Sequence, residues 1–410
     1  MKILLIYPYF LDERIHTDDI SVPPIGVYYV GAVLRENGYA VKILNWHHIH
    51  QSPKIIQQTL LKEKPDVIGF SVLHANRWGA IDIAAAAKSV NPHVKIVFGG
   101  IGATFLWRHL LTHFSTIDYI VLGEGEFTFL KLIRAIEQQN EDHVDAIPGI
   151  AYRQGTQVLC TPPAEPLQDL DQLPVPADYF KYQHVAFTRG CPGNCTFCGS
   201  PKFWGHRVRT HSPAYFVNQL ERLVRQGITS FYFSDDTFAY KKQHVLSICR
   251  DIVDRGLNIT WVAISRVNHV DEEMLRWMRK AGCTQISYGI ESGSEEIRRL
   301  LNKRIRNEDV QKAFDSTKKY GILPRAYFIY GSPGESRKTI RDTLNLMNSV
   351  KPLSAIFYIL DLFPGTALYE TFKKTHRVTD DIWLNRIEDI MYFETDPSLS
   401  KDNVLNFGNM

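Results

Sequence analysis

The 410-residue sequence lacks the marks of several protein classes. It has no apolar stretch near the length of about 18 residues that reads as a membrane span. Its first apolar run, Ile3–Tyr7, is too short for a signal peptide, and Pro8 ends it with no small-residue cleavage site following. The formal net charge is only +3, without a long basic run. We therefore expect a cytoplasmic protein with no membrane span and no nucleic-acid partner.

Cysteine is scarce outside one short segment. Three of the six cysteines lie within eight residues, at Cys191, Cys195 and Cys198, and the other three are scattered. A disulfide framework would spread its cysteines along a short secreted chain. The cluster instead indicates a metal site in a reducing compartment.

The length favours two domains over one core. Residues 1–140 alternate short apolar runs with helical patterns, which predicts a parallel sheet covered on both faces, a Rossmann-like α/β domain. The expected strands are 3–7, 41–46, 67–71, 94–99 and 119–122, and the expected helices are 26–37, 53–64, 78–89 and 126–137.

The second half repeats this alternation after a proline-rich linker. Residues 141–183 form that linker, with a hairpin signal at Gln154–Gly155. Residues 184–375 predict six βα units, a partial (β/α)6 barrel, with Ser212 and Pro213 as one clear helix start. Residues 376–410 are a short C-terminal extension with little pattern. The expected barrel strands lie near 184–189, 229–234, 259–265, 284–290, 324–330 and 355–362.

The segment RGCPGNCTFCGSP carries the strongest chemical signal. Its C-x3-C-x2-C spacing allows three thiolates to hold three irons of a 4Fe-4S cubane and leave the fourth iron open. An open metal position is a binding site. The alternative is a zinc knuckle, which needs a fourth ligand, and His206 is the nearest downstream candidate. This spacing is unusual for zinc.

This loop resembles the cluster motif of the radical S-adenosylmethionine (radical SAM) superfamily, including the aromatic Phe197. The resemblance implies that the open iron chelates S-adenosylmethionine, whose reductive cleavage gives a 5′-deoxyadenosyl radical. Four later segments match the family in order, at the ends of expected strands where a barrel places its active site. They are FSDDTF (233–238), GIESGS (289–294), YGSPGES (330–336) and FPGTALY (363–369).

The resemblance assigns a set of residues to S-adenosylmethionine. Taken alone, Asp235 with Asp236 reads equally well as a solvated strand end or a helix cap, and Glu291 as a charge at a helix N-terminus. The order of the segments behind the cysteine loop favours the functional reading. The assigned residues are Phe197, Asp235, Ser265, Arg266, Glu291 and Gly331.

The first domain resembles the cobalamin-binding domain fused to one branch of this superfamily. The matching segments are PPIGVYYVGAVLRENGY (23–39), IGFSV (68–72), FGGIGAT (98–104) and DYIVLGEGE (118–126). Their turns lie at the carboxyl edge of the expected sheet, where open α/β folds bind ligands. Two alternatives stay open: Gly99–Gly100 as an ordinary tight turn, and a domain that kept its fold but lost its cofactor. The resemblance assigns to cobalamin Gly26, Ser71, His74, Asn76, Trp78, Gly99, Gly100, Thr104, Gly123, Glu124 and Gly125.

The D-x-H-x-x-G signature that supplies a histidine to cobalt in many cobalamin proteins is absent. The loop after Ser71 contains His74, the one residue there able to bind cobalt well. A surface or capping histidine is the competing reading. We expect no nitrogen ligand on the lower face of cobalt, with Asn76 or Trp78 limiting access and His74 pointing elsewhere.

These features predict an enzyme that uses a 4Fe-4S cluster, S-adenosylmethionine and cobalamin. The expected activity is methylation of an unactivated carbon or phosphorus in a small molecule or biosynthetic intermediate, with an external reductant such as flavodoxin or ferredoxin. One alternative is radical chemistry without methyl transfer, as in ring contraction, cyclisation or epimerisation. Another is a cobalamin-binding sensor without catalysis, although such a protein has no need of an open cluster. The sequence identifies neither the substrate nor residues that act directly on it.

Overall fold

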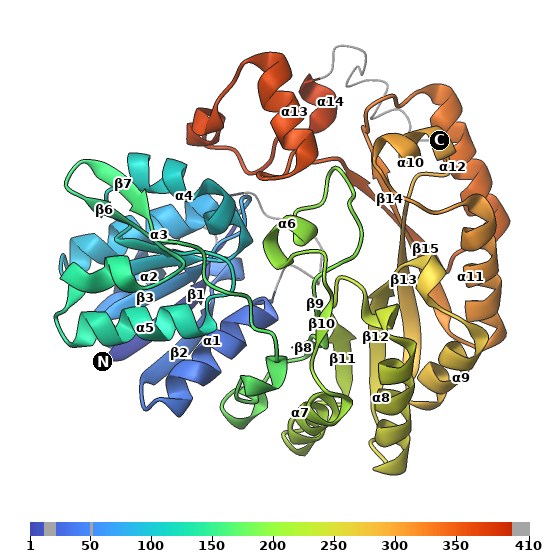
Figure 1. Cartoon of the computed structure of the whole chain (residues 1–410), viewed down its shortest axis with the longest axis horizontal. Helices are drawn as coiled ribbons and strands as arrows, with labels where there is room; N and C mark the ends of the chain where they lie inside the picture. Colours follow the sequence, from blue (N-terminus) through green and yellow to red (C-terminus); the bar gives the residue numbers. More distant parts are fainter. Residues whose placement is uncertain (12–21, 50–51, 396–410) are drawn as a thin grey trace. The chain divides into compact units, whose positions relative to one another are not determined.

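A computed structural model of the chain describes residues 1–11, 22–49 and 52–395 (Figure 1). The chain folds into two compact units. Unit 1 contains Met1–Gln168, Gln172–Phe180 and Glu370–Asp389, and unit 2 contains Asp169–Asp171, Lys181–Tyr369 and the described residues from Ile390. Residues 396–410 of the expected C-terminal extension lie outside the described residues.

Unit 1 is built on a seven-stranded sheet with the order β2-β1-β3-β4-β5-β6-β7. Strands β1 to β5 are parallel, and the hairpin β6–β7 continues the sheet antiparallel to β5. Strand β3 is buried almost throughout because helices cover both faces. The strands are β1 (Lys2–Tyr7), β2 (Ala40–Asn45), β3 (Val67–Ser71), β4 (Lys95–Gly99), β5 (Tyr119–Val121), β6 (Ile150–Gln154) and β7 (Gln157–Cys160).

Helices α1 and α5 pack together, as do α2 and α3 (Figure 1). Helix α3 lies so close to the segment after β1 that a Cβ on Gly79 would stand 2.1 Å from the backbone oxygen of Tyr9. Only glycine permits this approach. The helices are α1 (Ile25–Glu36), α2 (Pro53–Glu63), α3 (Arg77–Val90), α4 (Ile101–His113) and α5 (Glu126–Glu137).

Unit 1 is completed by a segment from the far end of the sequence, Glu370–Asp389, which we call the C-terminal segment. It contains most of α13 (Ala367–His376) and the short helix η7 (Asp380–Leu384). The Arg77 side chain is 1 % exposed and donates to the backbone oxygens of Trp383, Asn385, Ile387 and Glu388. This one guanidinium thereby satisfies the carbonyls of a segment that has little regular structure.

Unit 2 is an open parallel sheet of six strands in the order β15-β14-β13-β12-β11-β8, a partial barrel. Helices α7, α8, α9, α11 and α12 run along one side of it (Figure 1). Ser212 caps α7 by accepting from the Tyr215 amide, as its sequence position predicts. The strands are β8 (His184–Val185), β11 (Ser230–Phe233), β12 (Thr260–Ser265), β13 (Cys283–Glu291), β14 (Leu323–Tyr330) and β15 (Ser354–Ile359).

Shorter elements complete unit 2. A two-stranded ladder of β9 (Thr188–Arg189) and β10 (Arg209–Thr210) flanks the cysteine loop. The helices are α6 (Ser200–Trp204), α7 (Pro213–Arg225), α8 (Lys242–Asp254), α9 (Glu272–Lys280), α10 (Glu295–Leu300), α11 (Asn307–Lys319), α12 (Arg337–Val350) and α14 (Tyr392–Thr395).

The structure differs from the sequence-based division in three places. Helix α4 stands where no element was expected between two strands. The hairpin expected in the linker extends the sheet of unit 1, because β6 pairs with β5. Glu370–Asp389, expected as the end of the barrel and the start of the C-terminal extension, belongs to unit 1. No helix among the described residues is long and apolar enough to cross a membrane.

Candidate cluster and cofactor sites

The three clustered cysteines lie on one loop between β9 and α6, and each is partly exposed. Gly190 begins this loop with φ +105°, and a Cβ there would stand 2.6 Å from the Arg207 oxygen. Within the loop, the Gly193 amide donates to Cys191 Sγ over 3.4 Å. The loop is tight here, and the three cysteines lie close enough to influence one another electrostatically.

Two neighbouring aspartates brace the loop from the end of β11. Asp235 is 2 % exposed, and its Oδ1 accepts from the backbone amides of Phe187 and Thr188. Asp236 accepts from the Ser200 hydroxyl, directly after the last cysteine turn. The structure thus places Asp235, expected to contact S-adenosylmethionine, after β11, where it binds the backbone that leads into the cysteine loop.

The other side of the loop is tied to the turn after α10. The Thr196 amide donates to the Leu301 oxygen over 3.0 Å, and the Asn302 side chain donates to the Asn194 oxygen over 2.6 Å. The Leu368 amide at the start of α13 donates to the Thr196 oxygen. These three bonds hold the backbone on both sides of Cys195, and the sequence offered no signal for them.

Burial controls the protonation of the cysteines. It raises the pKa of Cys191 and brings that of Cys198 to about 12, while the charge of Arg266 acts in the opposite direction on Cys191. These thiols stay protonated near neutral pH until a metal displaces the proton. The Arg266 guanidinium lies beside the loop, since a Cβ on Gly193 would stand 3.1 Å from its Nη1.

A buried charged pair lies at the carboxyl end of β13. Glu291 has φ +69° and accepts from Lys303 Nζ over 2.7 Å, with both side chains about nine-tenths buried. Burial, together with the charges of Arg266 and Lys303, lowers the pKa of His269 to about 4. Glu291, Arg266 and His269 therefore share one basic region. Lys303 and His269 were not anticipated, because nothing in their sequence spacing points to Glu291 or Arg266.

The remaining residues assigned to S-adenosylmethionine occupy different surroundings. Ser265 ends β12, is 3 % exposed and donates to the Arg266 oxygen. Gly331 follows β14 with φ +75°, and a Cβ there would stand 3.3 Å from Phe393. Phe393 therefore packs over the end of β14. Phe197 is partly exposed within the cysteine loop.

In unit 1 the residues assigned to cobalamin gather at the carboxyl edge of the sheet. Gly100 and Gly123 have φ of +91° and +69°, and Thr104 Oγ1 accepts from the Gly123 amide over 3.1 Å. A Cβ on Gly26 or Gly123 would meet no described atom within 4 Å. Ser71 and Gly99 end β3 and β4, Gly125 precedes α5, and Glu124 accepts from the Leu167 amide.

The loop after β3 contacts the C-terminal segment. His74 Nε2 lies 3.3 Å from Asp389 Oδ1, and its ring packs edge-on against Trp383. Trp78 Nε1 donates to the Asn385 oxygen over 2.9 Å. Asn76 is fully buried and accepts from the Leu73 amide. All three loop residues assigned to cobalamin therefore direct a polar atom to protein. Their contact with cobalamin stays a prediction.

The cysteine loop fits a cubane cluster better than zinc. It supplies three thiolates, as a cubane with one open iron requires, whereas a structural zinc tetrahedron requires four ligands. The carboxyl edge of the sheet in unit 1 fits a large ligand on two observations. The turns at Gly26 and Gly123 have space beside the backbone, and Asn76 Nδ2 is buried without a hydrogen-bond partner among the described residues.

Comparison with known proteins decides the family. The Radical SAM superfamily model matches residues 185–347, and the B12 binding domain model matches residues 16–133. An uncharacterised methyltransferase of Pyrococcus horikoshii is 32 % identical over 382 residues, which cover 90 % of this chain and 83 % of that protein. This chain belongs to the cobalamin-binding branch of the radical SAM superfamily. It is an enzyme whose cofactors are a 4Fe-4S cluster, S-adenosylmethionine and cobalamin.

Two further comparisons define the range of this branch. The anaerobic magnesium-protoporphyrin IX monomethyl ester cyclase of Rubrivivax gelatinosus is 28 % identical over 95 % of this chain and 73 % of its own length. The radical S-adenosylmethionine methyltransferase TsrM of Kitasatospora setae, solved with cobalamin and a [4Fe-4S] cluster bound, superposes with a TM-score of 0.78 at 20 % identity. That match covers 92 % of this chain and 78 % of TsrM and confirms the expected fold.

Proposed function

We propose that this enzyme methylates an unactivated carbon or phosphorus of a small molecule or biosynthetic intermediate. The observation that carries the proposal is the pairing, in one chain, of a three-cysteine loop with a cobalamin-binding domain. The similarity to a methyltransferase over most of both chains supports the same reaction. When bound, the cluster and S-adenosylmethionine supply a hydrogen-abstracting radical, and cobalamin supplies the methyl group.

The residues of unit 2 would hold the first two cofactors. Cys191, Cys195 and Cys198 would ligate the cluster, and the hydrogen bonds that Asp235 and Asp236 accept hold the backbone before the loop and Ser200 after it. Arg266 lies close enough to the cysteine loop to offset the negative charge of a thiolate-bound cluster. Glu291 is oriented by Lys303 and accepts from it, which leaves its second carboxylate oxygen for the S-adenosylmethionine that the family resemblance assigns to it.

The turns of unit 1 would hold cobalamin. Backbone amides and small residues at Gly99–Gly100 and Gly123–Gly125 allow a large ring to approach the sheet edge closely. His74 faces Asp389, so we propose that it does not ligate cobalt. A low-potential one-electron donor of the flavodoxin or ferredoxin class would reduce the cluster.

The proposal is tested by anaerobic turnover with methyl-labelled S-adenosylmethionine and candidate substrates suggested by neighbouring genes. We expect 5′-deoxyadenosine, S-adenosylhomocysteine and labelled product in equal amounts. The triple Cys191/Cys195/Cys198→Ala variant should form none of them. Product that forms with 5′-deoxyadenosine but contains no label would contradict methyl transfer.

A second candidate function is radical chemistry without methylation. The similarity to an anaerobic cyclase, which extends over 95 % of this chain, supports it. In that case 5′-deoxyadenosine accompanies product while S-adenosylhomocysteine does not, so the same labelled assay separates the two functions.

A further inference from the structure

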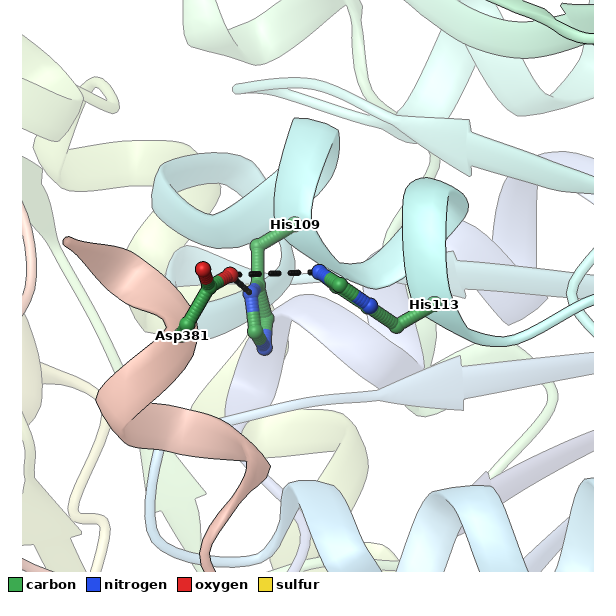
Figure 2. A group of neighbouring side chains, drawn as sticks. All are labelled: His109, His113 and Asp381. Atoms are coloured by element: carbon green, nitrogen blue, oxygen red, sulfur yellow. Dashed lines mark hydrogen bonds and ion pairs between the residues drawn. The ribbon is translucent and has the colours of Figure 1, made fainter.

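Helix α4 and the C-terminal segment bring three metal-ligand side chains together inside unit 1. His109 and His113 are four residues apart on α4 and therefore face the same side of the helix. Asp381 belongs to η7 and points its carboxylate between the two imidazoles (Figure 2). The three residues belong to unit 1, whereas the cluster cysteines belong to unit 2, and they have no part in the function proposed above.

The spacing matches one tetrahedral metal ion. Asp381 Oδ1 lies 3.2 Å from His113 Nε2 and 3.8 Å from His109 Nδ1, and one atom of each residue lies within 4.8 Å of the others. Ligands about 2.05 Å from a zinc ion at the centre of a tetrahedron are about 3.3 Å apart.

The buried ring of His109 supports a metal site independently of the spacing. Its side chain is 3 % exposed, and neither ring nitrogen has a hydrogen-bond partner among the described residues. A buried polar atom without a partner costs about 1 to 3 kcal/mol.

We propose that His109, His113 and Asp381 bind one divalent transition-metal ion, zinc by preference, with water as the fourth ligand. Two imidazoles and one carboxylate form a ligand set that suits zinc and disfavours calcium or magnesium, which prefer oxygen ligands only. The ion clamps η7 of the C-terminal segment onto α4.

The position of α4 gives this clamp its structural role. The helix begins directly after the Gly99–Gly100 turn, and a Cβ on Gly102 would stand 2.4 Å from the His74 amide nitrogen. The same C-terminal segment covers His74 and Arg77. A metal between η7 and α4 would therefore add a second attachment of the C-terminal segment, beside its contacts with His74 and Arg77. Both attachments would hold the segment along the edge of unit 1 to which cobalamin binding is assigned.

The test uses the full chain with its cluster and cobalamin intact, so that the cluster cysteines are not free to bind zinc. After zinc addition and removal of loose metal, elemental analysis should find one zinc per chain. His113→Ala and Asp381→Ala should weaken zinc binding at least about 10-fold in chelator competition. Both side chains are partly exposed, at 32 % and 64 %, so these variants should still fold. His93→Ala, an exposed histidine of unit 1, is the matched control.

X-ray absorption at the zinc edge provides the second measurement. We expect only nitrogen and oxygen ligands near 2.0–2.1 Å, with two imidazoles. A sulfur ligand near 2.3 Å, an unchanged affinity in both variants, or no zinc retained at micromolar concentration would each overturn the proposal. Digestion at the C-terminal segment should also slow when zinc is added to the wild-type chain but not to Asp381→Ala.

Discussion

The two units place their chemistry in opposite ways. In unit 2 the three metal ligands lie within eight consecutive positions, Cys191 to Cys198, and nearby strands only brace them. In unit 1 the edge assigned to cobalamin is assembled from four separate turns, and its loop after β3 is covered by residues some 300 positions later. The ligands of a site on one loop can be predicted from their spacing in the sequence, whereas the contacts of a site assembled from distant segments require the folded structure.

The cysteine loop should show the largest effect. Changing Cys191, Cys195 and Cys198 together to Ala should remove about four irons and four sulfides per chain, because these thiolates are the proposed ligands. Changing Cys160, Cys249 and Cys283 should leave the cluster in place, since Cys249 and Cys283 are buried in the barrel. Iron and sulfide analysis of anaerobically purified protein measures this. Loss of iron from the second variant would show that the ligands were chosen wrongly.

The attachment of the C-terminal segment to unit 1 should depend on the Arg77 guanidinium. Arg77→Met keeps the apolar volume but leaves several carbonyls of the C-terminal segment without a donor. We expect unit 1 to lose about 3 kcal/mol of unfolding free energy and the segment to become sensitive to protease. Arg108→Met, an exposed change on α4, is the control. Equal thermal melting and equal digestion of the two variants would contradict the role given to Arg77.

The buried carboxyl of Asp235 should make the folding stability depend on pH. Burial raises the pKa of this carboxyl to about 7 from an ordinary value of 3.8. Between these values the folded state keeps a proton that the unfolded state has released, so stability falls as pH rises from about 4 to about 7. Asp235→Asn, which accepts from the same amides, should remove this dependence, which amounts to about 4 kcal/mol in full and about 3 kcal/mol between pH 5 and pH 8.

Thermal melting at pH 5 and pH 8 measures the effect of Asp235→Asn. The exposed Asp254→Asn serves as the control and should keep the wild-type dependence. A wild-type slope retained in Asp235→Asn would show that another group titrates.

His74 should have the smallest effect on cobalt. Because its Nε2 faces Asp389, we expect electron paramagnetic resonance of the Co(II) form to show no nitrogen superhyperfine triplet from this residue. The spectra of wild type and His74→Ala should be identical. A triplet that vanishes in the variant would identify His74 as the lower ligand.

The sequence predicted both sheets because their strands are short apolar runs with turn residues between them. Helix α4 was missed for a physical reason. It begins after a glycine with no side-chain cap, contains Gly102 and several aromatic residues, and departs from helical geometry at Leu106. Its stability comes from packing, which local propensity does not reveal. The place of the C-terminal segment in unit 1 could not be predicted for a related reason. Several of its backbone carbonyls accept hydrogen bonds from Arg77, about 300 residues earlier, and no local sequence pattern indicates this contact.

The central claim is that this chain cleaves S-adenosylmethionine reductively, with a cluster that three cysteines would hold and that would leave one iron free to bind it. It is tested most directly by incubating the cluster-loaded protein with S-adenosylmethionine and a strong reductant, without substrate, and measuring 5′-deoxyadenosine. We predict slow formation of this nucleoside by the wild-type chain and none by the triple Cys191/Cys195/Cys198→Ala variant. A wild-type protein with a full cluster that never forms 5′-deoxyadenosine would contradict the account.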